Sequence, residues 1–309
     1  MIDLSTTLCG LHFSSPVAMA SGNAGYGIEY PFVSGFSNRD AGAVFLKGTT
    51  LEPRTGNRPE RVMESPSGLL NAIGLQNPGA KAIIENTLPK LDLSESQFII
   101  NVSGSTVEDY AEVVRMFDQT ELPAIEINIS CPNVKKGGAA FGNDPDMAAQ
   151  VVEACRQATS KPLIVKLSPN QTDIAEGARR VIDAGADMLS AINTLMGMQI
   201  DIHTQAPTLG NNQGGLSGPA IKPVALLKVH QVYQIAKAHN VPVIGLGGIA
   251  SAEDAIEFLL AGASMVAVGT ALAKDPLLVK KINRGLRRYM KRYGYSQVSD
   301  LTGCLRLNE

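Results

Sequence analysis

Cys131, in the run NISCPN, has the sequence setting that most favours chemistry. It directly follows an apolar, β-branched run, and Lys135 and Lys136 come soon after it. Nearby cations favour the thiolate of a cysteine, whose ordinary pKa is about 8.5. A thiolate at the end of a strand can act as a base or a nucleophile, so Cys131 is the candidate catalytic residue. The other cysteines lack this setting, and no CxxC spacing indicates a disulfide framework or a protein-bound zinc or iron-sulfur site.

Polar side chains recur at the last one or two positions of several other apolar runs. They are Ser21, Lys47, Asn101, Asn128, Lys166, Asn193 and Thr194. A single asparagine at such a place is more often a turn residue. Two lysines and three asparagines at equivalent strand ends would gather hydrogen-bond donors around one cavity, and satisfying them requires an anionic, carbonyl-rich ligand.

Glycine turns follow the last two apolar runs. Gly247 and Gly248 follow the first of these runs, and Gly269 and Thr270 follow the second. In α/β barrels, exposed backbone N–H groups after the seventh and eighth strands bind phosphate. The sequence therefore predicts a phosphorylated cofactor.

The elements that position these residues are eight short apolar runs, each expected to be a strand. Most are followed by a turn and a stretch of helical periodicity, which predicts parallel strands. The expected strands are 16–22, 43–48, 97–103, 124–130, 162–168, 188–194, 241–248 and 264–270. Eight such units predict one α/β domain over 1–309, a (β/α)8 TIM barrel. An open doubly wound sheet is the alternative, but no early GxGxxG turn follows the first strand.

Helices are expected between most of the strands, and several have recognisable ends. The expected helices are 106–118, 145–159, 172–184, 222–239, 251–261 and 274–293. Thr106 and Ser251 are predicted N-caps, while Gly185 and Gly262 follow helices where a left-handed residue is needed. The connections 49–95, 131–144 and 195–221 leave the carboxyl ends of strands and exceed ordinary loop lengths, so they are expected to cover the ligand.

The composition limits the class of partner. Lys and Arg total 27 against 29 Asp and Glu, and the resulting net charge of −2 predicts neither a nucleic-acid nor a membrane partner. The four histidines show no metal-ligand spacing, so no metal site is predicted. No apolar run is long enough to span a membrane, and residues 1–17 lack the features of a signal peptide, so a cytoplasmic location is expected.

Eight motifs, spread over nearly the whole chain, resemble those of class 1 dihydroorotate dehydrogenases. They are LKGTTLEPRTGNRPER, NAIGLQNPG, NISCPN, VKLSPN, AINT, GGLSGPA, GLGGI and AVGTAL. The stretches NISCPNVKKGGAAFG and RPERVMESPSGLLNAIGLQNPG are most similar to class 1B, the NAD-linked branch. Class 2 enzymes use a serine base and carry an amino-terminal membrane helix, and this sequence has neither feature.

The resemblance implies one flavin mononucleotide (FMN) per chain. The implied FMN-binding residues are Ser21, Lys47, Gly48, Asn101, Asn128, Lys166, Ile192, Gly218, Gly247, Gly248, Gly269 and Thr270. The phosphate would lie near the final glycines. Lys166 would lie beside the N1/O2 edge of the flavin, where a fixed cation stabilises the negative charge gained on reduction.

The resemblance also implies the substrate, the reaction and the partners. Dihydroorotate would contact Lys47, Asn71, Ala72, Ile73, Gly74, Leu75, Asn128, Asn193 and Thr194. Cys131 would remove the C5 proton while C6 delivers hydride to FMN N5, which gives orotate for pyrimidine synthesis. Electrons would reach NAD through FAD and an iron-sulfur cluster in a partner subunit, with two copies of this chain forming a homodimer inside a heterotetramer.

Three other interpretations remain open. A class 1A-like enzyme would pass electrons to fumarate instead of NAD. Another FMN barrel would act on a different reduced pyrimidine, as in proteins that resemble dihydropyrimidine dehydrogenase or dihydrouridine synthase. A non-enzymatic barrel would bind a phosphorylated metabolite as a scaffold, and such a protein need not hold a flavin.

Overall fold

The computed structural model describes residues 2–129 and 142–308 and contains a closed barrel of eight parallel strands. Around the barrel the strand order is β10-β15-β16-β3-β4-β7-β8-β9. The strands are β3 (Val17–Met19), β4 (Ala43–Phe45), β7 (Gln97–Val102), β8 (Ile125–Asn128), β9 (Leu163–Leu167), β10 (Met188–Ala191), β15 (Val243–Leu246) and β16 (Met265–Val268). Each lies within a predicted strand, so the barrel prediction is confirmed.

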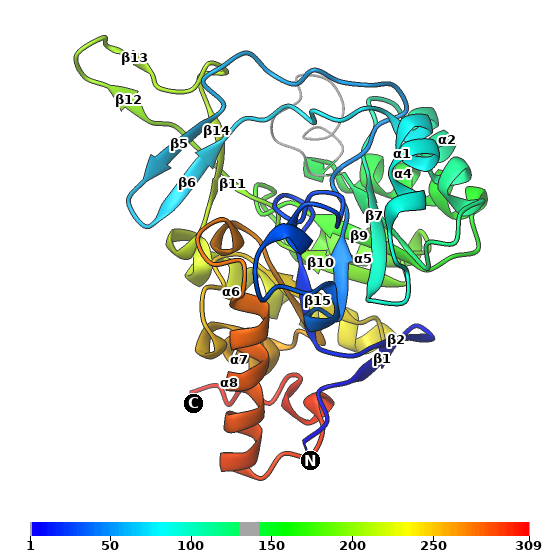
Figure 1. The fold of residues 1–309 in the computed structure, drawn as a ribbon, viewed down its shortest axis with the longest axis vertical. Helices are drawn as coiled ribbons and strands as arrows, with labels where there is room; N and C mark the ends of the chain where they lie inside the picture. Colours follow the sequence, from blue (N-terminus) through cyan, green and yellow to red (C-terminus); the bar gives the residue numbers. More distant parts are fainter. Residues whose placement is uncertain (1, 130–141, 309) are drawn as a thin grey trace.

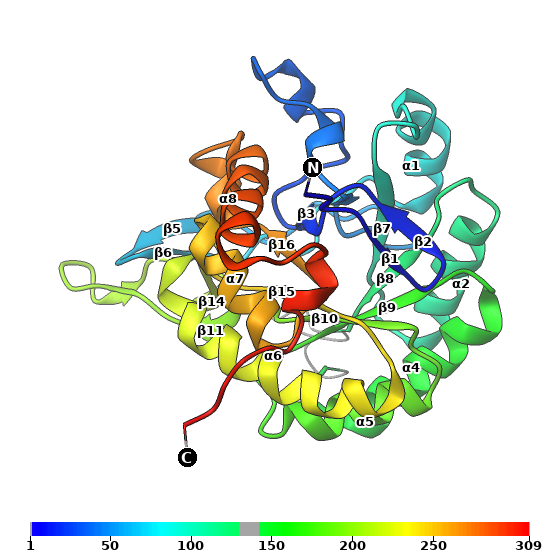
Figure 2. The same ribbon diagram turned by 90° about the horizontal axis from the view of Figure 1, so that it is seen from below.

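Helices surround the barrel, as the end-on view shows (Figure 2). They are α1 (Ala80–Asn86), α2 (Val107–Asp118), α4 (Pro145–Ala158), α5 (Ile174–Asp183), α6 (Lys222–Ala236), α7 (Ala252–Ala261) and α8 (Leu278–Tyr293). The predicted N-caps are confirmed, because the Thr106 and Ser251 side chains accept hydrogen bonds from the backbone N–H groups of Asp109 and Asp254. Gly185 and Gly262 have φ angles of 105° and 121°, as their predicted positions after helices require.

Two apolar layers explain why the strands are buried on both faces. One layer packs between the strands and the helices and includes Val44, Ile100 and Val165. The other fills the barrel interior and includes Ala18, Ala43, Ile99, Ala124, Ile164, Met188, Ile244 and Met265, seven of them on barrel strands and Ala124 directly before β8. Phe13, from the hairpin of β1 (Thr6–Leu8) and β2 (Leu11–Phe13), packs against this interior layer. The interior is therefore a packed core below the carboxyl ends of the strands.

A second, antiparallel sheet arises from two of the predicted long connections. Its order is β11-β14-β6-β5, and its strands are β5 (Val62–Ser65), β6 (Gly68–Asn71), β11 (Leu195–Gly197) and β14 (Gly214–Ser217). β12 (Ile200–Asp201) and β13 (Ala206–Pro207) form a hairpin that projects from the molecule beside this sheet (Figure 1). The long connections were predicted to cover the strand ends, and part of that cover is this second sheet. It was missed because its strands are short and because its central pair, β6 and β14, joins segments more than a hundred residues apart in the sequence.

Within residues 2–129 and 142–308, none of the helices combines the length and apolar character needed to cross a membrane.

Candidate active site

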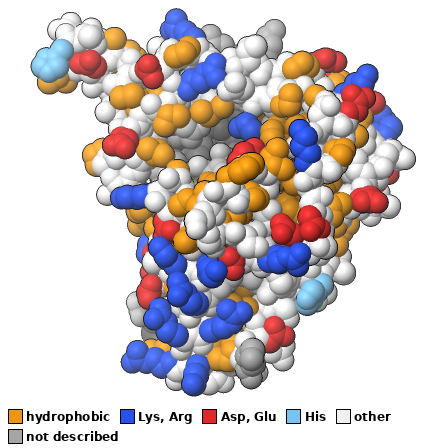
Figure 3. All heavy atoms as spheres, in the orientation of Figure 1, with side chains coloured by type: hydrophobic (Ala, Val, Ile, Leu, Met, Phe, Trp, Pro, Cys, Tyr) orange, Lys and Arg blue, Asp and Glu red, His pale blue; other side chains and the backbone are white. Residues whose placement is uncertain are grey.

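A cavity of about 410 Å³ lies where the carboxyl ends of the barrel strands meet the second sheet. The space-filling view shows the face of the molecule hollowed below that sheet (Figure 3). Of the predicted site residues, the lining includes Ser21, Lys47, Gly48, Asn71, Ile73, Gly74, Leu75, Asn101, Asn128, Lys166, Ile192, Asn193, Thr194, Gly218, Gly247, Gly248, Gly269 and Thr270. Residues from all eight barrel strand ends and from the second sheet therefore converge on one space.

Among the predicted site residues that the structure describes, one is not part of this lining. Ala72 is fully buried and packs with Leu70 and Leu209 below the second sheet. Its backbone N–H donates to the Arg61 carbonyl at 2.7 Å, which fixes this segment to the chain before β5. Ala72 does not reach the cavity. Cys131 lies outside the described residues, and its catalytic role stays a prediction.

Lys166, in the middle of the barrel wall, is the buried cation of the cavity. Its backbone pairs with Asn128 on β8 and Ser190 on β10, and the residue is only 6% exposed. Its ammonium forms no hydrogen bond or ion pair with any residue that the structure describes. A buried charge without a counter-charge is costly, so a cavity that faces one favours an anionic or carbonyl-rich ligand.

Three of the lining asparagines are linked to one another. Asn128 Nδ2 donates to Asn101 Oδ1 at 3.5 Å, and Asn193 Nδ2 donates to Asn128 Oδ1 at 3.2 Å. The backbone N–H of Thr194 donates to Asn193 Oδ1 at 2.8 Å. The buried Tyr110 hydroxyl of α2 donates to the Asn128 carbonyl at 2.8 Å and so anchors the end of β8. These contacts restrict the amides before any ligand arrives.

Glycines line the cavity where side chains would not fit. A Cβ on Gly248 would lie 2.9 Å from the Gly218 carbonyl oxygen, and φ angles of 96° and 82° at Gly218 and Gly248 are left-handed. A Cβ on Gly48 would lie 2.9 Å from Asn101 Oδ1. Such turns leave the backbone open to close approach by an anion, as the sequence predicted for the final strands.

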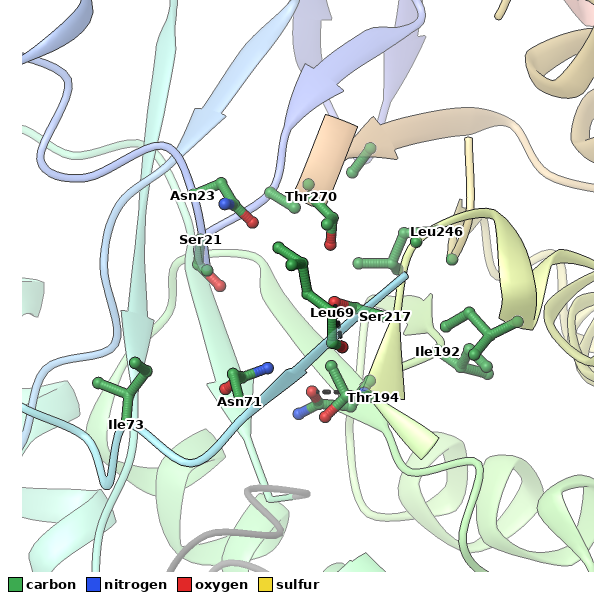
Figure 4. A pocket seen from close by; sticks show the side chains of 18 of the residues that line it. Ser21, Asn23, Leu69, Asn71, Ile73, Ile192, Thr194, Ser217, Leu246 and Thr270 are labelled. Carbon is green, nitrogen blue, oxygen red and sulfur yellow. Dashed lines mark hydrogen bonds between the residues drawn. The ribbon is translucent and has the colours of Figure 1, made fainter. Parts of the chain in front are cut away.

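The second sheet contributes polar groups from outside the barrel. Asn71 on β6 donates through Nδ2 to the Gly215 carbonyl at 3.2 Å, which connects the two central strands of the sheet. Asn71 and Thr194 lie on the same side of the cavity in the close view, with Ser21 and Thr270 along its other wall (Figure 4). A ligand in this cavity is therefore contacted by the barrel and the sheet together.

Several lining residues were missed by sequence reasoning. Asn23, Leu69 and Ser217 line the cavity although none was predicted to do so. Asn23 follows β3 by four residues, and a further polar residue after a strand end was the available signal. Leu69 and Ser217 are paired with each other across β6 and β14. Nothing in the local sequence indicates a pairing between such distant strands.

The remaining cysteines lie away from the cavity, in agreement with their sequence setting. Burial raises the pKa of the Cys155 thiol to about 12. Burial also raises the pKa of Cys9, whose Sγ donates to the Asp187 carbonyl at 3.3 Å. The exposed Cys304 donates to the Asp300 carbonyl at 2.9 Å. Neither Cys155 nor Cys9 is a reactive thiolate at neutral pH.

Known proteins resemble this chain along almost its entire length. The family model described as dihydroorotate dehydrogenase matches residues 3–290. A relative from Pelobacter propionicus, named dihydroorotate dehydrogenase B (NAD(+)), catalytic subunit, is 51% identical over 98% of both chains. Relatives of the same name are 49% identical in Desulforamulus reducens, over 99% of both chains, and 50% identical in Bacillus pumilus, over 97% of this chain and 96% of that one. Matches of this extent show that the chain belongs to the dihydroorotate dehydrogenase family.

Proposed function

We propose that this chain is the catalytic subunit of an NAD-linked dihydroorotate dehydrogenase and oxidises dihydroorotate to orotate in pyrimidine synthesis. The carrying observation is the buried residue Lys166, whose ammonium has no partner among the described residues, at a cavity whose lining includes several amides and glycine turns. Orotate and a flavin both present carbonyl oxygens and negative charge, which these groups can satisfy. The names of the full-length relatives support the same reaction.

The cavity fits flavin mononucleotide by size and chemistry. Its volume of about 410 Å³ lies within the range of small-molecule and cofactor sites. The glycines after the last two strands, with Thr270, would hold the phosphate. The remaining FMN ligands would be Ser21, Lys47, Gly48, Asn101, Asn128, Lys166, Ile192 and Gly218. When bound, FMN would supply the acceptor for the hydride that leaves C6 of the substrate.

The substrate would be held by the amides of the cavity and by the second sheet. Each asparagine side chain supplies both a donor and an acceptor, which suits the alternating N–H and C=O groups of a pyrimidine edge. Asn71, Asn128, Asn193 and Thr194 would bind this edge, with Lys47 near the carboxylate. The side chain of Ala72 is excluded from these contacts by its burial under the sheet.

The residues of this chain would have two roles in the chemical step. Cys131, as its thiolate, would take the proton from C5, because a base works best when its pKa lies near the working pH. Lys166 would keep a fixed positive charge where electron density arrives, and its burial strengthens that effect. Proton and hydride would then leave adjacent carbons of one substrate.

The electrons would leave through a partner subunit that carries FAD and an iron-sulfur cluster. The phrase "catalytic subunit" in the names of the relatives supports a division of labour between chains. A homodimer of this chain inside a heterotetramer, in the cytoplasm, completes the proposal. Reduction of fumarate is the second candidate, and assays that offer fumarate or NAD with the partner separate the two.

The visible spectrum of the purified chain, recorded without oxygen before and after addition of dihydroorotate, tests the proposal. We expect a flavin band that bleaches on addition of the substrate. A yellow protein that ignores dihydroorotate but responds to another reduced pyrimidine would retain the flavin barrel and reject this substrate. A colourless protein that takes up no FMN would reject the proposal and favour the scaffold interpretation.

A further inference from the structure

A buried carboxylate lies beneath the cavity, on the same strand as Asn128. Glu126 is 2% exposed, and Ala124 of the interior layer and Asn128 of the cavity lining lie two residues to either side of it. Since side chains two apart on a strand share a face, Glu126 faces the barrel interior. It does not line the cavity, and none of the roles described above uses it.

Glu126 belongs to a polar band across four neighbouring strands. Asn101, Glu126, Lys166 and Ser190 each lie two residues beyond the apolar interior layer, on β7, β8, β9 and β10. Glu126 Oε1 accepts from the Ser190 hydroxyl at 2.7 Å, and Oε2 accepts from Asn101 Nδ2. The carboxylate and the Lys166 ammonium form no ion pair. Glu126 is therefore held by two neutral donors, one on each side.

The hydrogen bond to Glu126 determines which way the Asn101 amide points. Because a Glu126 oxygen accepts this hydrogen bond, Asn101 turns its Nδ2 toward Glu126 and its Oδ1 away. That Oδ1 then accepts from Asn128, whose own Oδ1 accepts from Asn193. At the far end the Thr194 N–H, which only donates, faces Asn193 Oδ1. In this hydrogen-bond chain from Thr194 to Glu126, every donor therefore points toward the carboxylate.

We propose that Glu126 is a positioning residue, which fixes the amide orientation of Asn101 and, through Asn128 and Asn193, the donors and acceptors that the cavity offers to its ligands. The Thr194 N–H sets one end of this chain and Glu126 sets the other. The longest link, 3.5 Å between Asn128 and Asn101, comes directly after the hydrogen bond from Asn101 to Glu126, so the orientation of Asn101 depends chiefly on Glu126. The inference rests on the proposed function for the identity of the ligands, but the hydrogen-bond chain itself does not.

Two substitutions at Glu126 and a matched control test this role. Glu126→Leu removes both acceptors and leaves the buried Asn101 Nδ2 without its partner. Glu126→Gln keeps the shape and one acceptor but removes the charge. Ser190→Ala removes the other hydrogen bond to the same carboxylate and leaves the asparagine chain intact. The measurements are the Kd of FMN for the apoprotein, from flavin fluorescence, the Kd of orotate, from the flavin spectrum, and the melting temperature.

We expect Glu126→Leu to weaken orotate and FMN binding by about tenfold each, because a charge-assisted hydrogen bond to a ligating amide is lost. Glu126→Gln should weaken them by about threefold, since its carbonyl can still accept from Asn101. Ser190→Ala should keep both constants within about twofold of wild type, whatever its melting temperature. If Glu126→Leu fails to fold, the Kd values of Glu126→Gln are compared with those of Ser190→Ala to test the role of Glu126.

Three results would overturn the inference. They are unchanged Kd values for FMN and orotate in both Glu126 variants, a loss of affinity in Ser190→Ala as large as that in the Glu126 variants, or a lower melting temperature with no change in either Kd. A wild-type protein that binds FMN but not orotate would reject the proposed substrate. The FMN constants would then still decide the role of Glu126. A protein that binds neither ligand would reject both proposals.

Discussion

At the scale of single residues, Lys166 is the most informative side chain to remove. Lys166→Met keeps an unbranched side chain and deletes a buried charge that has no protein partner among the described residues. We expect the folded protein to be at least as stable as wild type, while FMN binding weakens by about tenfold or more. Flavin fluorescence gives the affinity, and Lys81→Met, at a side chain that is 79% exposed, is the control. Equal FMN affinity in both variants would exclude Lys166 from the flavin site.

Cys131 is the second prediction at this scale. Cys131→Ala should retain FMN but lose most of the rate of reduction by dihydroorotate, because no base remains for the C5 proton. Cys131→Ser should also be slow, since a hydroxyl ionises far less readily than a thiol. Stopped-flow recording of the flavin band measures both, with the exposed Cys304→Ala as the control. A rate that does not change in Cys131→Ala would remove this residue from the mechanism.

At the scale of elements, the backbone of the second sheet closely approaches Thr194, a residue of the cavity lining. A Cβ on Gly215 of β14 would lie 2.0 Å from Thr194 Oγ1, at the start of the strand that pairs with it. Gly215→Ala should therefore displace Thr194 and weaken orotate binding by about tenfold. The double variant Gly215→Ala, Thr194→Gly removes the Thr194 Oγ1 and also its Cβ, which would lie at 2.6 Å, so it should bind orotate as Thr194→Gly alone does. If the double variant is much weaker, the glycine has another role.

The contact between α6 and α7 gives a pH-dependent prediction. Lys222 Nζ lies 2.6 Å from Asp254 Oδ1, and this hydrogen bond raises the pKa of Lys222. Burial acts to raise the pKa of Asp254, but hydrogen bonds from Lys222, Ala250 and Ser251 outweigh it and hold that pKa below its usual value. A lowered carboxyl pKa stabilises the fold above the unfolded value of about 3.9, and this stabilisation is lost as pH falls through the folded value.

Asp254→Asn should accordingly lower the melting temperature by about 2–4 °C at neutral pH. The difference from wild type should stay constant between about pH 6 and 8 and shrink below about pH 4. Calorimetry or fluorimetry across this range measures it, with Glu257→Gln, at the more exposed of the two carboxylates that contact Lys222, as the control. A difference that grows as pH falls would have the wrong sign for this mechanism.

At the scale of the whole molecule, the division of labour between subunits is the main prediction. The purified chain should be reduced quickly by dihydroorotate but form NADH only slowly, because its proposed route to NAD runs through a partner. Addition of the FAD and iron-sulfur subunit should restore NADH formation. Rapid NADH formation by this chain alone would contradict the division, and rapid turnover with fumarate would favour the second candidate. Light scattering of the isolated chain tests the proposed dimer.

Much of the fold could be predicted because its signals are local. Strands such as Leu163–Leu167 are continuous apolar runs, and helices such as Val107–Asp118 begin at a capping pair three residues apart. Both features lie within a few residues of chain, and closure of a barrel follows from repeating the unit eight times. The candidate site followed for the same reason, since parallel strands bring their carboxyl ends to one mouth.

The sequence by itself determined the barrel, the family and most of the residues that line the cavity. Only the tertiary structure decided what depends on distant pairing. β6 pairs with β14 in the second sheet, the side chain of Ala72 packs under that sheet, and the carboxylate of Glu126 accepts a hydrogen bond from the amide of Asn101. Local periodicity predicts which face of a strand is buried, but it does not predict which atoms contact each other there. Those partners come from three-dimensional packing of segments that are far apart in the chain.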